Sequence, residues 1–156
     1  MTEVTHKAFG AIILAFILMN FITSPDQLPK VDTWDLQCLS GAMEIENGSN
    51  GDRALLLTGS VILNRLNSPK WDGNTIEEVV LARDYGYQQY ASVTRNGFRN
   101  KKASERTVLL AKYLLLYGAI CPPTVMYQGT AKNGHGVYEA LSNLPGQRAT
   151  EYFCYE

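Results

Sequence analysis

Two glutamates, two positions apart, are the side chains in this sequence best placed for acid–base chemistry. Glu44 and Glu46 lie at the end of a helix-like apolar segment, just before the turn-forming residues 47–51 (NGSNG). On a helix, positions i and i+2 point roughly 200° apart, so the two carboxyls are not a paired acid–base unit. Glu46 adjoins the turn and is the better candidate to face inward. Partial burial and the negative end of the helix dipole would both disfavour ionisation of its carboxyl, as a general acid requires.

Other residues of catalytic type have simpler explanations. Asp52 is close enough in sequence to be a second carboxylate, but a cap or a favourable charge at a helix start explains it better. Cys38, Cys121 and Cys154 show no CxxC pattern and no metal-ligand spacing, and small buried residues explain them. A cysteine peptidase would need Cys38 or Cys121 with His135, which lies in a glycine turn, and two prolines follow Cys121 where an activating helix N-terminus would be needed. We expect no metal site and no cofactor.

The spacing of apolar residues predicts four helices followed by a small β unit. Helices are expected over residues 34–46, 52–66, 76–81 and 104–116. The second is apolar nearly all round and should be the buried central helix. The stretch 82–102 is polar, aromatic and punctuated by glycine, and we expect an ordered loop there. Short β-type runs follow at residues 125–127, 136–138 and 152–155. The sequence therefore predicts an α+β domain.

The N-terminal stretch has a different character. Residues 8–22 are apolar except for Asn20, and they follow a short polar head. A membrane span needs about 20 apolar residues, so this shorter segment fits a signal-peptide core or a signal anchor, with a buried core helix as the alternative. Bulky residues at its end argue against cleavage. We predict that residues 1–30 are an export or anchor segment with a linker. Residues 31–156 would then form the folded domain outside the cytoplasmic membrane.

Composition narrows the possible partners. The chain has 156 residues, of which 46% are hydrophobic and 19% charged, as in a single globular domain. Fifteen acidic and fourteen basic side chains leave a formal net charge of −1. Proteins that bind nucleic acid usually carry a basic face, so nucleic acid is not an expected partner.

Several short motifs follow one another along the folded part of the chain. They are Glu46 with its glycine turn, then VILNR at residues 61–65, IEEVV at 76–80, Gln89-Tyr90-Ala91, VMYQ at 125–128, GVY at 136–138 and YFCYE at 152–156. Their order resembles that of the SleB-type cell-wall hydrolases, the family that includes spore-cortex-lytic enzymes. The resemblance covers roughly residues 35–156 and implies a lysozyme-like α+β fold.

The resemblance also implies an activity and a site. Members of the family cleave the glycan strands of peptidoglycan, commonly as lytic transglycosylases, and Glu46 matches their catalytic acid. In that reaction the 6-hydroxyl of the substrate is the nucleophile, so one carboxyl can serve as acid and then as base. Plain hydrolysis would need a second carboxylate. Substrate-binding side chains are expected at Gln89, Tyr90, Tyr127, Gln128 and Tyr152.

One position departs from the pattern of the family. Some members of the family carry a histidine where Glu151 stands here, which leaves any role of that histidine without a counterpart. Asn64 and Arg65 are expected to hold the turn around Glu46 rather than to touch substrate. The main alternative to an enzyme is a membrane-tethered, catalytically inactive wall-binding or structural protein of the same fold.

Overall fold

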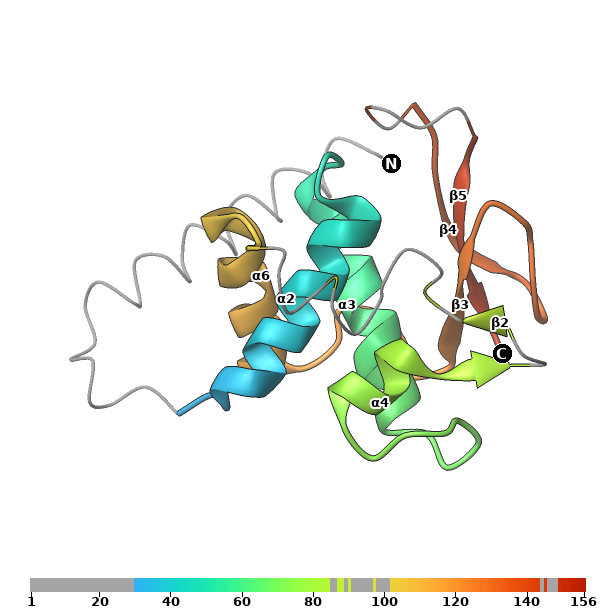
Figure 1. Ribbon diagram of the computed structural model, residues 1–156. Helices are drawn as coiled ribbons and strands as arrows, with labels where there is room; N and C mark the ends of the chain where they lie inside the picture. Colours follow the sequence, from blue (N-terminus) through green and yellow to red (C-terminus); the bar gives the residue numbers. More distant parts are fainter. Residues whose placement is uncertain are drawn as a thin grey trace. The chain divides into compact units, whose positions relative to one another are not determined.

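The computed structural model describes residues 30–84, 87–88, 90, 97, 102–143, 145 and 149–156 (Figure 1). The apolar segment predicted to be an anchor, residues 8–22, lies outside the described residues. Within the described part, no helix combines the length and the apolar character that crossing a membrane requires. All the helices and strands below belong to one compact unit, Val31–Glu156.

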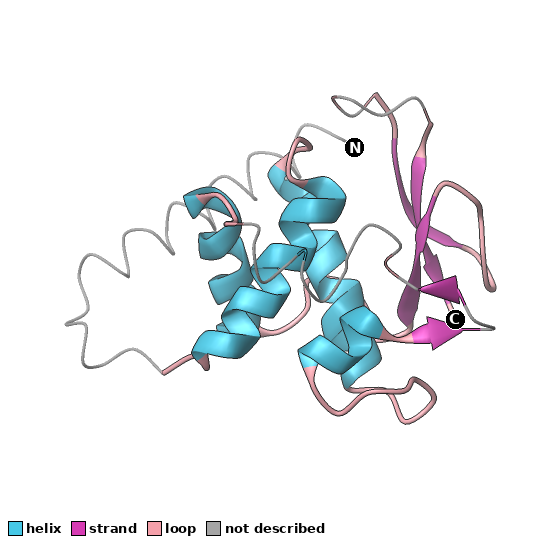
Figure 2. Cartoon of the chain, in the orientation of Figure 1, coloured by secondary structure: helices cyan, strands magenta, loops and turns pink. Residues whose placement is uncertain are grey.

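Four helices are described, and they confirm the predicted ones to within one residue at each end (Figure 2). Three of them begin at side-chain caps that satisfy backbone N–H groups of the first turn, namely Asp32, Thr75 and Ser104. These caps are local features, which is why the sequence predicts the helix starts so closely. The helices are α2 (Thr33–Asn47), α3 (Asp52–Leu66), α4 (Ile76–Leu81) and α6 (Glu105–Tyr117).

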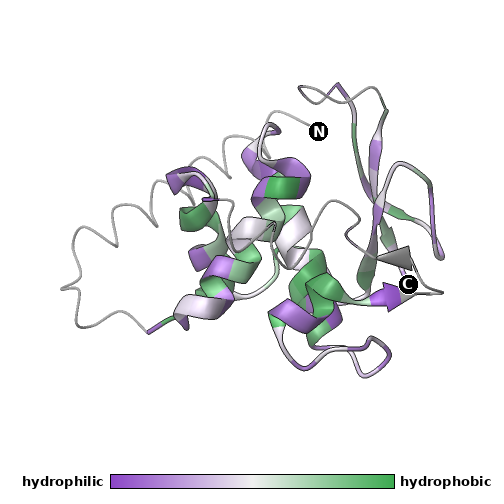
Figure 3. Cartoon of the chain, viewed as in Figure 1, coloured by the Kyte–Doolittle hydropathy of each residue, from purple (hydrophilic) through white to green (hydrophobic). Residues whose placement is uncertain are grey.

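Helix α3 is the buried centre of the domain, as predicted. Every residue from Ala54 to Arg65 is buried, and α3 contacts α2, α4, α6 and the sheet. Figure 3 shows hydrophobic colour in the part of α3 that runs beside α4. Gly59 permits α3 to approach α2 and α6 closely, because a Cβ there would collide with Leu114 of α6 and lie 2.8 Å from the sulfur of Met43 of α2.

A three-stranded antiparallel sheet follows the helices. Its strands are β3 (Val125–Gly129), β4 (Val137–Leu141) and β5 (Glu151–Tyr155), in the order β3-β5-β4. The last strand of the chain is therefore the central one. The helices and this sheet confirm the α+β class. The stretch 82–102, expected to be loop, also contains a small hairpin of β1 (Arg83–Asp84) and β2 (Tyr87–Gln88), so the expectation was wrong for these residues.

Two buried polar side chains of α3 attach the sheet to the helices. The amide nitrogen Nδ2 of Asn64 donates to the carbonyls of Pro122 and Val125, at 2.8 and 3.0 Å. Nε of Arg65 donates to the carbonyl of Met126 at 2.7 Å. The predicted role of Asn64 and Arg65 was therefore wrong. They hold the segment that enters β3, not the turn after Glu46, because their positions on α3 face the sheet.

Candidate active site

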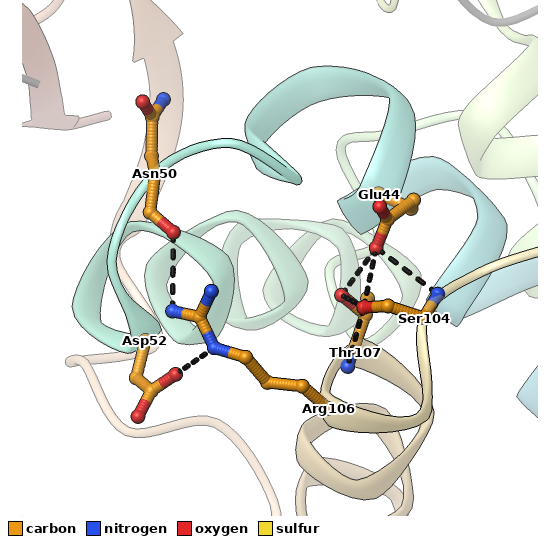
Figure 4. A network of polar contacts seen from close by, with 6 residues as sticks. All are labelled: Glu44, Asn50, Asp52, Ser104, Arg106 and Thr107. Atoms are coloured by element: carbon orange, nitrogen blue, oxygen red, sulfur yellow. Dashed lines mark hydrogen bonds and ion pairs between the residues drawn. The ribbon is translucent and has the colours of Figure 1, made fainter. Parts of the chain in front are cut away.

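The two glutamates of α2 diverge, as helix geometry predicts. The carboxylate of Glu44 accepts hydrogen bonds from Thr107 and from the hydroxyl and backbone N–H of Ser104, at the start of α6 (Figure 4). Glu46 instead lines a pocket together with residues of β3 and β5. One carboxylate therefore supports the start of a neighbouring helix, and the other lines a pocket against the sheet.

The pocket beside Glu46 has a volume of about 170 Å³. A water molecule occupies roughly 30 Å³ of liquid, so there is room for a few waters or for the polar edge of a sugar ring. The surrounding residues come from α2, α3, β3 and the residue after it, β5 and the stretch 82–102. They are Glu46, Arg65, Tyr90, Gln128, Gly129, Thr130 and Glu151.

Glu151 brings a second carboxylate to this pocket, and it is 5% exposed. Its Oε1 atom accepts two hydrogen bonds, from Nδ2 of Asn47 at 3.1 Å and from Nε2 of Gln128 at 2.7 Å. Both donors are neutral amides on different elements, one at the end of α2 and one on β3. Together they hold the carboxylate in one orientation.

Asn47 is fully buried and its amide orientation follows from its neighbours. The hydroxyl of Thr58 donates to the carbonyl of Ala54 at 2.9 Å and so accepts from Nδ2 of Asn47, at 2.7 Å. Oδ1 of Asn47 accepts from Nδ2 of Asn50. Because the Nδ2 atom must be the donor to Thr58, its other hydrogen is the one directed at the carboxylate of Glu151.

Tyr90, Gln128 and Glu151 each have a buried polar atom with no hydrogen-bond partner among the described residues. These atoms are the hydroxyl of Tyr90, Oε1 of Gln128 and Oε2 of Glu151. Leaving a buried polar atom unpaired costs roughly 1–3 kcal/mol, so native proteins seldom do it without a reason. A ligand rich in hydroxyl groups, or a bound water, would satisfy these atoms.

Of the described residues that line the pocket, Arg65 is the one with a positive charge. Its guanidinium lies 4.2 Å from the ring centroid of Trp71 and 5.3 Å from that of Tyr90. Burial raises the pKa of Tyr90 above its usual 10, and the charge of Glu46 raises it further while that of Arg65 opposes the shift. Tyr90 therefore presents a neutral hydroxyl to the pocket at physiological pH.

Asp52, the other carboxylate considered for hydrolysis, does not line the pocket. It forms an ion pair with Arg106 of α6, whose Nη2 also donates to the carbonyl of Asn50 at 3.1 Å (Figure 4). Asp52 is the first residue of α3, where a negative charge is favourable. The interpretation of Asp52 as a charge at a helix start is confirmed.

The predicted substrate-binding residues divide into three groups. Tyr90 and Gln128 line the pocket with Glu46, and Gln89 lies outside the described residues. Tyr127 and Tyr152 do not line the pocket: the Tyr127 ring packs 5.7 Å from that of Trp71, and Lys132 lies 5.4 Å from the ring centroid of Tyr152. Neighbouring strand residues point to opposite faces, so Tyr127 and Gln128 cannot line one wall. A substrate contact of these two tyrosines elsewhere stays a prediction.

Sequence reasoning missed Arg65 and Glu151 as pocket residues. Arg65 lies on the helix predicted to be buried, and an arginine is almost never fully buried unless it has a partner. Its position therefore indicated a specific contact. Glu151 lies beside the predicted closing β run, one residue before its start, where strand alternation would have placed it on the face opposite Tyr152. Neither signal shows which partners these side chains meet.

A thiol nucleophile finds no support in the structure. Cys121 lies in a core cluster with Leu57, Val61, Val125 and Phe153, while His135 is exposed. Burial raises the pKa of the Cys121 thiol above its usual 9, which leaves it protonated and unreactive. Among the residues that the structure describes, no group of three or more His, Cys, Asp or Glu side chains could hold a metal ion.

Comparison with models of protein families, with curated proteins and with solved structures found no match. The pocket and the ordered motifs along the chain are therefore the features that bear on function.

Proposed function

We propose that this protein cleaves the glycan strands of peptidoglycan, with Glu46 as the general acid. The observation that carries the proposal is the place of Glu46, at the end of a helix and in a polar pocket against a small sheet. The same observation favours a lysozyme-like arrangement, in which an acid on a helix faces a β unit across the substrate. The ordered motifs of residues 46–156 add the substrate class.

The first half of the reaction needs one carboxyl. Glu46, in its protonated form, gives its proton to the glycosidic oxygen while the bond from that oxygen to the anomeric carbon breaks. The leaving sugar departs with a new hydroxyl, and positive charge develops on the other sugar ring. The carboxylate that remains on Glu46 stabilises this charge. Acid catalysis of this kind contributes on the order of 10²–10⁴-fold to the rate.

The second half can follow two routes. In the lytic route, the 6-hydroxyl of the sugar attacks its own anomeric carbon and returns a proton to Glu46, which yields a 1,6-anhydro ring. In the hydrolytic route, water attacks and yields a reducing end. The hydroxyl of Tyr90 and the amide of Gln128 suit a neutral, hydroxyl-rich ligand in either case, because they can donate to and accept from sugar hydroxyls.

We further propose that residues 8–22 hold or export the protein at the cytoplasmic membrane, so that residues 31–156 face the cell wall. The apolar run of the sequence supports this, and a peptidoglycan substrate requires it. Fusion of the full chain to a reporter enzyme that folds only outside the membrane should give an active reporter. An inactive reporter with the protein present would contradict export.

The activity is tested with the full chain in mild detergent. Purified peptidoglycan is incubated with the wild type, with Glu46→Gln and with Glu44→Gln, and the released fragments are identified by mass spectrometry. Glu44 is a matched control, because it lies on the same helix but binds α6 rather than the pocket. We expect release by the wild type and by Glu44→Gln, and a loss of at least about 100-fold with Glu46→Gln.

Two results would contradict the proposal. Full activity of Glu46→Gln would remove Glu46 as the acid. Binding of peptidoglycan without release by any of the proteins would replace the enzyme with a tethered wall-binding protein.

A further inference from the structure

The carboxylate of Glu151 is held at one oxygen and left without a partner at the other. Oε1 accepts from Asn47 and Gln128, whereas Oε2 is buried and has no hydrogen-bond partner among the described residues. A carboxylate that served only to join α2 to β3 would gain more if donors satisfied both oxygens. The side chain is 5% exposed and lines the same pocket as Glu46.

Three other carboxylates of the domain are engaged with a cation or with the start of a helix. Glu44 binds the start of α6, Asp52 binds Arg106, and Glu139 of β4 forms an ion pair with Arg53. None of them lines the pocket. Glu151 is therefore the second carboxylate of the pocket among the described residues.

We infer that Glu151 is the general base of the reaction and that the protein hydrolyses the glycosidic bond, an inference that rests on the proposed function. Oε2 of Glu151 accepts one proton of a water molecule while the oxygen of that water bonds to the anomeric carbon. The bond to the leaving oxygen breaks as Glu46 protonates it. One water is consumed, and the products are a reducing-end sugar and a free hydroxyl. The proton on Glu151 is then lost to solvent and Glu46 regains one.

Asn47 and Gln128 are positioning residues in this scheme. Their amide N–H groups occupy Oε1, so Oε2 is the oxygen left to receive a proton from water. The amide of Asn47 is itself fixed by Thr58 and Asn50, which keeps this orientation rigid. A preorganised base of this kind needs little rearrangement when substrate binds.

The test is the identity of the product, made by the full-length wild type in water enriched in ¹⁸O. We expect reducing ends that carry one ¹⁸O atom at the anomeric carbon. Fragments that end in 1,6-anhydro sugars, with no ¹⁸O, would overturn the inference and leave the proposed glycan cleavage intact. No release of fragments at all would instead contradict the proposed function. This measurement needs no variant and so does not depend on the folding of one.

Two variants of Glu151 then test its role. In Glu151→Gln the amide oxygen can still accept from Asn47 and Gln128, so the fold is retained while the base is lost. We expect release to fall on the order of 10²–10⁴-fold, with substrate affinity nearly unchanged. In Glu151→Ala, added formate should restore part of the activity by supplying a carboxylate. Full activity of Glu151→Gln, or inactive Glu151→Ala that folds and binds substrate but gains nothing from formate, would contradict the general base.

Discussion

Replacement of Asn47 by alanine should be among the most destabilising changes near the pocket. The side chain is 0% exposed, and its amide donates to Thr58 and Glu151 and accepts from Asn50. Each of the two neutral bonds contributes about 1 kcal/mol, and the bond to the charged carboxylate roughly 1.5–3 kcal/mol. We therefore expect Asn47→Ala to lower the free energy of unfolding by about 4 kcal/mol. In a domain of this size the corresponding fall in Tm is about 15 °C.

Urea denaturation followed by circular dichroism measures this difference. Ser49→Ala is the matched control, because Ser49 is an exposed residue of the same turn whose hydroxyl makes one long hydrogen bond, at 3.5 Å to the carbonyl of Pro145. An exposed substitution of this kind should change stability by no more than about 0.5 kcal/mol. The reasoning would be refuted if Asn47→Ala were within about 1 kcal/mol of the wild type, because the buried network would then contribute little to the fold.

Three further predictions concern burial and charge in the same domain. Burial raises the pKa of both Tyr90 and Cys121, so each side chain ionises more readily in the unfolded chain than in the folded protein. The stability that this difference provides is complete below about pH 9 and should fall as the pH rises through 9 and 10. An unchanged urea midpoint between pH 7 and 10.5 would contradict this prediction. Arg65→Met keeps the apolar stem but loses the hydrogen bond to the carbonyl of Met126 and the contacts with two aromatic rings, which should cost about 3 kcal/mol of unfolding free energy in the same assay. Glu44→Ala removes the hydrogen-bond acceptor at the start of α6 and should lower the free energy of unfolding by about 1 kcal/mol, with no loss of peptidoglycan cleavage. A cleavage defect at unchanged stability would show that this side chain acts in the reaction.

The sequence by itself determined the elements whose causes are local. The helix starts follow from the caps at Asp32, Thr75 and Ser104, and the burial of α3 follows from its nearly continuous apolar run. The divergence of Glu44 and Glu46 is a consequence of helix geometry alone, since each residue of a helix turns by about 100°. The β runs were also recognised, although their bounds shifted by a residue or more, because pairing between strands decides where a strand ends.

Only the tertiary structure decided which side chains share the pocket. Asn47 and Glu151 are 104 residues apart in the chain, and they meet because β5 becomes the central strand of a sheet fixed to α3. In the same packed domain, Asn64 and Arg65 donate to backbone carbonyls at and before the start of β3. Gln128 lines the pocket and Tyr127 does not. Asp52, at the start of α3, forms its ion pair with Arg106 of α6. Such contacts join residues far apart in sequence, and no propensity or spacing encodes them. The candidate acid could therefore be chosen from the helix end, the turn and the ordered motifs of the sequence, whereas its candidate base could be found only after the chain had folded.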